Sequence, residues 1–94
     1  MIGKWDNELL VAAWDGDLIE VRTALENGAN PNTKTANGWT PLYIEAQESH
    51  VNVIRVLHER GAYPRIADNG ERIPLDYAKD SAIRNLLESA LRNS

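Results

Sequence analysis

One spacing, a period of 33, recurs along this chain of 94 residues and restricts its fold more than any other feature. The segment Gly28-Ala29-Asn30-Pro31 returns one period later as Gly61-Ala62-Tyr63-Pro64, and Pro41-Leu42 returns as Pro74-Leu75. Leu9 lies one period before Leu42. A fixed period of this length is typical of repeat architectures, in which each repeat is one supersecondary unit that buries its apolar face against its neighbours.

Each period predicts a pair of short helices. Thr40 is a suitable helix cap, and Pro41 at the first helical position loses no hydrogen bond by lacking an N–H group. Leu42 and Ala46 then share one helix face. The second helix of the pair turns Val53, Ile54 and Leu57 inward, because these residues have helical spacing.

Glycines and asparagines separate the predicted helices. Gly28 and Gly61 each follow a helix end, where glycine accepts the left-handed backbone conformation at little cost. Asn37-Gly38 and Asn69-Gly70 are dipeptides of the hairpin-turn type and lie between successive helix pairs. The chain is therefore expected to alternate helix pairs with hairpin turns.

The internal repeat resembles a known family. Residues 38–46, Gly-Trp-Thr-Pro-Leu-Tyr-Ile-Glu-Ala, are similar to the motif G-x-T-P-L-H-x-A of ankyrin repeats, and His50 matches the histidine of the family's Gly-His pair. The resemblance extends from about Gly3 to Leu91. It implies an all-α ankyrin repeat solenoid of three helix-turn-helix repeats, with a concave face built from the first helices and the hairpin tips.

The resemblance divides residues 1–94 into one domain of three repeats: an N-terminal cap (1–34), an internal repeat (35–67) and a shortened C-terminal cap (68–94). The first cap has Asp6-Asn7-Glu8 in place of Thr-Pro-Leu, which suits a polar outer face. The third repeat is about three residues short between Ala78 and Ile83, and its last helix is expected over Ser81 to Arg92. Three repeats are near the minimum for a stable array.

Composition excludes several function classes. The chain has no cysteine, which rules out disulfides and thiolate chemistry, and it has no apolar run long enough to span a membrane. A net charge of −4 without a basic block disfavours nucleic-acid binding. His50 and His58 fit no recognisable metal-site pattern. We therefore expect a cytoplasmic protein without cofactor or metal whose partner is another protein; the residues leave open whether it is natural or engineered.

In this family function means partner binding, so the resemblance implies a contact surface on the hairpin tips and the far ends of the first helices. Register maps Trp14, Asn37, Trp39, Tyr43, Gln47, Glu48 and Arg72 to that surface, together with Asp15, Ala36, Asn69 and Gly70. Trp14 and Trp39 are the expected anchors, because aromatic residues and arginine dominate interface energetics. The alternative is that each tryptophan covers hairpin backbone within the monomer.

Two other aromatic residues have alternative roles. Tyr43 stands where the family usually has a histidine that braces the turn. Its hydroxyl could keep such a hydrogen bond, or its ring could form one aromatic patch with Trp39. Trp5 is expected to pack over the first helix pair from the hairpin region of the first cap.

An enzymatic function is not expected, but two departures from the family pattern keep the question open. Glu45 replaces an alanine and Ser49 replaces a glycine, and a serine, a base and a carboxylate suffice for acyl transfer. Glu45 is expected to lie in the concave groove, solvated or in an ion pair, with Arg72 as one candidate partner. Two alternative functions remain: a self-associating homodimer, and a designed hydrolase that uses Ser49 and His58.

Overall fold

The computed structural model describes residues 3–93, so residues 1, 2 and 94 at the ends of the predicted domain lie outside it. The described chain is all-helical and contains no strand between residues 3 and 93. Its elements in order are α1 (Lys4–Asp15), α2 (Leu18–Glu26), α3 (Pro41–Glu48), α4 (Val51–Glu59), the 3-10 helix η1 (Pro74–Tyr77) and α5 (Ser81–Arg92). The all-α repeat architecture implied by the family resemblance is confirmed.

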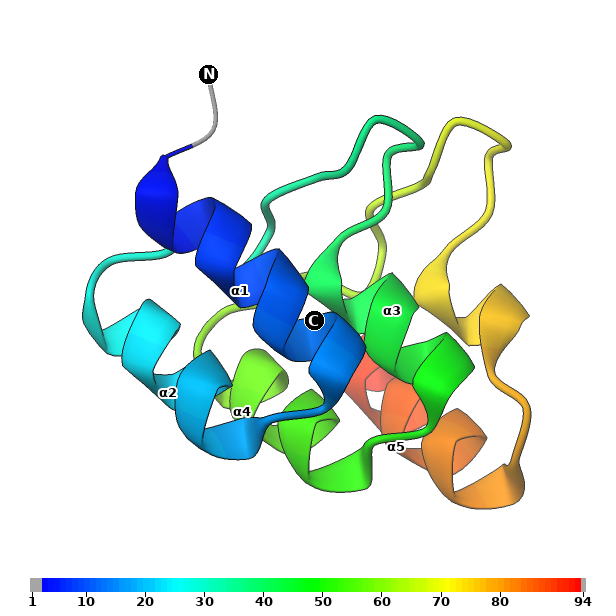
Figure 1. The fold of residues 1–94 in the computed structure, drawn as a ribbon. Coiled ribbons are helices and arrows are strands. Elements are labelled where there is room, and N and C mark those ends of the chain that lie inside the picture. The colour runs from blue at the N-terminus through cyan, green and yellow to red at the C-terminus, as the bar shows by residue number, and fades with distance from the viewer. Residues whose placement is uncertain (1–2, 94) are drawn as a thin grey trace.

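The helices form two layers, as Figure 1 shows. The inner layer consists of α1, α3 and η1, and the outer layer consists of α2, α4 and α5. Two long loops, which precede α3 and η1, project together from one edge of the stack. Equivalent elements of successive repeats lie side by side, so residues one period apart in the sequence become spatial neighbours.

A single apolar core runs through the stack. The residues predicted to face inward, Leu42, Ala46, Val53, Ile54 and Leu57, are all buried in it. The core also contains residues of α1, α2 and α5, among them Leu9, Val21, Ile83 and Leu87. A smaller cluster of Leu10, Ala13 and Ile44 joins α1 to α3.

Helix starts follow local capping chemistry. The side chain of Asp17 accepts a hydrogen bond from the Glu20 amide at the start of α2, and Asp80 accepts one from Ile83 at the start of α5. Thr40 occupies the cap position of α3 as predicted, but its buried hydroxyl oxygen makes no hydrogen bond within residues 3–93. Its carbonyl oxygen accepts from the Tyr43 amide instead, at 3.0 Å.

The helix ends explain one of the two departures from the family pattern. Gly16 ends α1 with φ of 67°, and Ser49, one period later, ends α3 with φ of 64°. A non-glycine residue is rarely found in this conformation because its Cβ crowds the backbone. Ser49 therefore occupies a glycine position of the scaffold and adopts the glycine conformation.

The two long loops are hairpins, and hydrogen bonds join one to the other. The Asn69 amide donates to the carbonyl of Asn37 at 3.1 Å, and the Asn69 side chain donates to the carbonyl of Ala36 at 3.1 Å. The left-handed residue of the first hairpin is Gly38, as expected, but that of the second is Glu71 rather than Gly70. Glu71, and not Gly70, is therefore the structural equivalent of Gly38 one period later.

The third repeat departs from the others at its first helix. The predicted shortening is observed: η1 has four residues where α3 has eight, and α5 begins at Ser81 as expected. With fewer residues before α5, the chain completes one 3-10 turn and then extends through Ala78. This change brings Tyr77, the last residue of η1, against the residues of the second repeat described next.

Candidate protein-interaction surface

Four aromatic side chains, from α1, the first hairpin, α3 and η1, form one contiguous cluster. The rings of Trp14 and Trp39 lie 6.3 Å apart, and Trp39 stacks almost parallel to Tyr43 at 6.5 Å. Tyr77 meets Trp39 and Tyr43 edge-on at 5.4 and 5.6 Å. We call these four residues, Trp14, Trp39, Tyr43 and Tyr77, the aromatic ridge. Offset and edge-on contacts of this kind are the favoured geometries of aromatic pairs.

A buried carboxylate, Asp68, fixes the ridge. Its Oδ2 atom accepts hydrogen bonds from the Trp39 indole at 3.1 Å and from the Tyr77 hydroxyl at 2.6 Å. Its Oδ1 atom accepts from the backbone amides of Gly70 and Arg72, each at 2.9 Å. These donors, with Tyr77 the strongest, lower the pKa of Asp68 below its usual range because they stabilise the ionised form.

Exposure varies strongly along the ridge. Trp14, on α1, is 45% exposed, whereas Trp39 is half-buried. Val11, one turn before Trp14 on the same helix, is 49% exposed and extends this apolar surface. Sequence reasoning missed Val11; its spacing of three residues from Trp14 was the available signal. The accessible end of the ridge is therefore at α1.

Tyr43 was predicted to lie on the contact surface, and this prediction is wrong. Its side chain is only 1% exposed, because it lies against the second hairpin, which precedes η1. The two roles considered for it are both observed: its hydroxyl contacts the carbonyl oxygens of Ile66 and Arg72, and its ring stacks on Trp39. Burial, and then the charge of Asp68, raise the pKa of Tyr43 to about 12. Tyr43 supports the surface from within the stack.

The other predicted contact residues surround the exposed rings. Asn37 is exposed in the first hairpin, and Glu48 is exposed at the last position of α3. Gln47 is half-buried, and its side-chain oxygen has no hydrogen-bond partner within residues 3–93. Arg72 is exposed at the second hairpin, with its guanidinium 5.9 Å from the centre of the Tyr77 ring.

Trp5 belongs to the first turn of α1 and not to a hairpin, which corrects the expected location. It is half-buried against the core, as expected for its packing role, and the Lys4 ammonium lies 5.1 Å from its ring centre. This contact is a cation–π interaction.

Glu45 is also placed differently from the prediction. It is fully buried rather than solvated, and its partner is His50 and not Arg72: Glu45 Oε2 lies 2.5 Å from His50 Nδ1. Burial, and then the nearby charge of Glu48, raise the pKa of Glu45 from 4.5 to about 9. At neutral pH the carboxyl group therefore keeps its proton, and it shares a hydrogen bond with Nδ1 of His50.

His50 joins two turns of neighbouring repeats, as the family resemblance implies. It begins α4, and a Cβ atom on Gly16 would collide with its imidazole ring. The ring thus fills the space that glycine leaves open at the turn between α1 and α2. The Glu45–His50 pair is part of the packing between the first two repeats.

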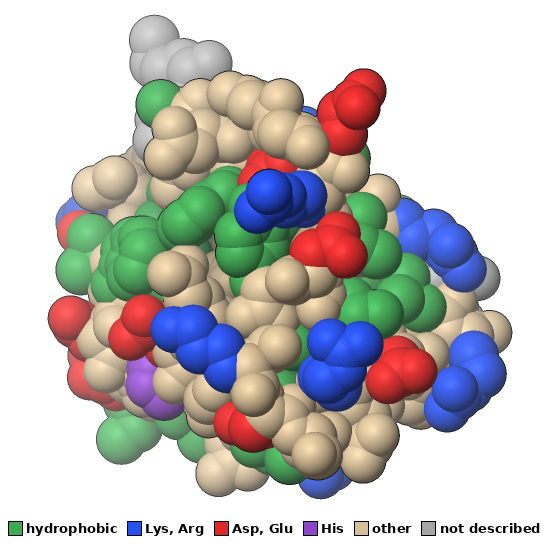
Figure 2. All heavy atoms as spheres, turned by 90° about the vertical axis from the view of Figure 1, so that its right-hand side faces the viewer, with side chains coloured by type: hydrophobic (Ala, Val, Ile, Leu, Met, Phe, Trp, Pro, Cys, Tyr) green, Lys and Arg blue, Asp and Glu red, His purple; other side chains and the backbone are tan. Residues whose placement is uncertain are grey.

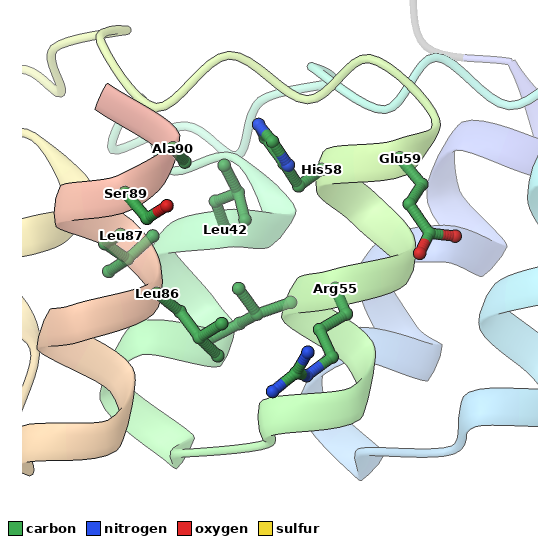
Figure 3. Close-up of a pocket in the computed structure, with 9 residues that line it drawn as sticks. Leu42, Arg55, His58, Glu59, Leu86, Leu87, Ser89 and Ala90 are labelled. Carbon is green, nitrogen blue, oxygen red and sulfur yellow. The ribbon is translucent and has the colours of Figure 1, made fainter. Parts of the chain in front are cut away.

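The serine and histidine of the hydrolase hypothesis are not brought together. Ser49 precedes α4, whereas His58 lies near its end, roughly 10 Å further along the helix axis. His58 faces a cavity of about 190 Å³ between α4 and α5, which Ser89 also lines, while the Glu59 side chain points away from it (Figure 3). No hydrogen bond joins His58 to a serine or a carboxylate in the described chain, so this cavity lacks an activated nucleophile.

Comparison with known proteins identifies the family. The model of ankyrin repeats (3 copies) matches residues 9–92, which is most of the chain. The chain belongs to the ankyrin repeat family. A putative ankyrin repeat protein of fowlpox virus is 33% identical over 69 residues, covering 73% of this chain and 9% of the relative. An ankyrin repeat-containing protein of Schizosaccharomyces pombe is 34% identical over 65 residues, 69% of this chain and 31% of the relative.

Relatives with enzymatic names match over similar segments. A putative E3 ubiquitin-protein ligase of Arabidopsis thaliana is 32% identical over 84 residues, covering 86% of this chain. This chain spans 22% of that relative and less than a third of the other two, so the likeness concerns only a part of each relative. Ankyrin repeats are generally protein–protein interaction modules and are typically not enzymes themselves. None of the helices described here is long and apolar enough to cross a bilayer.

Proposed function

We propose that this ankyrin repeat domain binds a partner protein through the exposed end of the aromatic ridge, at Trp14 and Trp39, with Asn37, Gln47, Glu48 and Arg72 around it. The observation that carries the proposal is the pairing of an exposed tryptophan with a fixed one. Trp14 is 45% exposed, and the ring on which it packs is held by its hydrogen bond to Asp68.

A fixed aromatic surface favours binding for two reasons. A tryptophan buries on the order of 150–250 Å² in a contact, which is worth several kcal/mol at about 25 cal/mol per Å². Rigid side chains also lose little conformational entropy when a partner immobilises them. Trp39 satisfies its indole N–H within the monomer, so its burial under a partner leaves no donor unpaired.

The proposal is tested with Trp14→Ala bait protein in affinity capture, with Tyr63→Ala as the matched control. Tyr63 is 62% exposed but lies on the loop after α4, away from the ridge. We expect a bound protein that wild type and Tyr63→Ala retain and that Trp14→Ala loses. If Trp14→Ala and wild type retain the same proteins in equal amounts, the ridge is not the contact surface.

A homodimer through the same surface is the second candidate, because Val11 and Trp14 together expose apolar area on α1. In a symmetric dimer the same patch meets itself, so Asp15 and Glu48 of both copies would be brought close together. Sedimentation velocity over a concentration series separates the two functions: an s-value that rises with concentration in wild type but not in Trp14→Ala indicates the dimer, and a constant monomer value excludes it.

A further inference from the structure

Charge is distributed unequally between the two helix layers. The outer helices α2, α4 and α5 carry four arginines and four glutamates, which balance. The inner elements α1, α3 and η1 carry one lysine and six acidic residues, of which Glu45 keeps its proton at neutral pH. The end of the stack at the third repeat, shown in Figure 2, intersperses basic and acidic side chains, so no single sign dominates there. The excess negative charge of the chain therefore belongs to the inner layer.

The charges near the aromatic ridge differ in how far they are already engaged. Lys4 lies over Trp5 and Arg72 over Tyr77, so each of these cations already has an aromatic partner. By contrast, Glu8, Asp15 and Glu48 are exposed and form no ion pair within residues 3–93. Lys34 and Lys79 lie on the flanking loops, outside the helices that carry these carboxylates.

Two of these carboxylates stand at the same edge as Trp14. Asp15 is the last residue of α1 and follows Trp14 directly, and Glu48 is the last residue of α3. The two helices run side by side in the same direction, so their C-terminal ends lie together (Figure 1). The helix ends themselves carry partial negative charge, and neither helix has a basic residue in its last turn.

We infer that the partner presents a basic segment, and that one of its arginines packs on the exposed face of Trp14 with its guanidinium directed to Asp15 and Glu48. This inference rests on the proposed function and specifies the partner's chemistry. A planar guanidinium both stacks on an indole and donates in a fork that matches carboxylate oxygens, which an ammonium group does not do. The same charges that oppose a symmetric dimer attract such a segment.

The test uses a synthetic peptide probe, acetylated and amidated, that alternates arginine with leucine. A second peptide replaces each arginine with the neutral isostere citrulline, and a third replaces it with glutamate. Affinity is measured by tryptophan fluorescence at low and moderate salt. We expect the arginine peptide to bind at least about tenfold more tightly than the citrulline peptide, and to weaken between about 0.05 M and 0.3 M salt because exposed charges are screened.

A matched pair of double variants locates the site. Asp15→Asn with Glu48→Gln removes the two carboxylates at the ridge, whereas Glu26→Gln with Glu59→Gln removes the last residues' charges from α2 and α4. Both double variants raise the net charge equally, and each substitution changes the last residue of its helix. We expect only the first pair to weaken binding of the arginine peptide, by about tenfold, and equal effects of the two pairs would overturn the inference.

The outcomes also separate this inference from the proposed function. If the citrulline or glutamate peptide binds as tightly as the arginine peptide and Trp14→Ala abolishes that binding, the proposed contact surface is supported. The inference that the partner is basic is then wrong. If the arginine peptide binds with an affinity that neither Trp14→Ala nor the first double variant changes, both are wrong.

Discussion

Two buried carboxyl groups, Asp68 and Glu45, show how differently the same chemical group behaves at two places in this small stack. Asp68 accepts four hydrogen bonds, and its pKa falls below the usual range. Glu45 has one partner, His50, and its pKa rises to about 9. Burial alone does not decide which form is present. The number of donors and the depth of burial decide it together: hydrogen bonds hold Asp68 ionised, and desolvation keeps the proton on Glu45.

The backbone around each carboxyl group explains the difference. Asp68 lies in a hairpin, where amides such as those of Gly70 and Arg72 have no helical partner and are available to its side chain. Glu45 lies in the middle of α3, where neighbouring amides already bond within the helix. A loop can therefore surround a carboxylate with donors, whereas a helix leaves it dependent on a side chain from elsewhere.

The largest expected effect is that of Asp68→Ala. The substitution leaves the Trp39 indole, the Tyr77 hydroxyl and two amides without their acceptor, and unmade hydrogen bonds of buried donors are costly. We expect the melting temperature to fall by roughly 10 °C or more, with a red-shifted tryptophan emission as Trp39 is released. Asp80→Ala, which removes a single cap bond from α5, is the control. A melting temperature within a few degrees of that control would show that Asp68 does not fix the ridge.

The next effect concerns pH and Glu45. Because the folded pKa of Glu45 is raised from 4.5 to about 9, its contribution to stability is complete below pH 4.5 and is lost as the pH rises through about 9. Between these values the folded state holds one more proton, so the free energy of unfolding falls by up to about 1.4 kcal/mol per pH unit. Urea titrations across this window should show that slope in wild type and lose it in Glu45→Gln.

Glu48→Gln is the matched control for that pH dependence, since Glu48 is an exposed carboxylate on the same helix. It should keep most of the slope, because burial and not the charge of Glu48 is the main cause of the shift. Identical slopes in wild type and Glu45→Gln would mean that Glu45 ionises normally in the folded protein. The contrast with Asp68, whose contribution is lost only as the pH falls into the acid range, would then disappear.

The period of 33 predicted the helices of this protein well, because core spacing, glycine at helix ends and proline at helix starts are local signals. The resemblance to ankyrin repeats added the shortened third repeat, with its last helix at Ser81–Arg92. The sequence assigned Trp14, Trp39 and Tyr43 to one surface, but it could not predict that Tyr77 joins them, since Tyr77 reaches Trp39 only because η1 is one 3-10 turn. Asp68 was missed as well, although an aspartate two residues before a glycine is typical of side-chain-bonded turns. The contact of Glu45 with His50, the N-cap residue of α4, was not predicted either, because a single motif does not reveal it.

The smallest expected effect is the change in stability on Ser49→Gly. This substitution alters the turn beside Glu45 without changing the carboxyl group. Ser49 has φ of 64° and donates its amide to the Glu45 carbonyl at 2.7 Å. Ser49→Gly should stabilise the fold by about 1 kcal/mol, because glycine reaches this conformation without Cβ crowding. Ser89→Gly, the same chemical change within α5, should instead destabilise by about 0.5 kcal/mol, since glycine is a poorer helix former. Ser49→Gly should also leave the pH slope intact, because the carboxyl group and its histidine are unchanged. A loss of that slope in Ser49→Gly would show that the strained turn, and not burial of Glu45, sets the proton affinity of the pair.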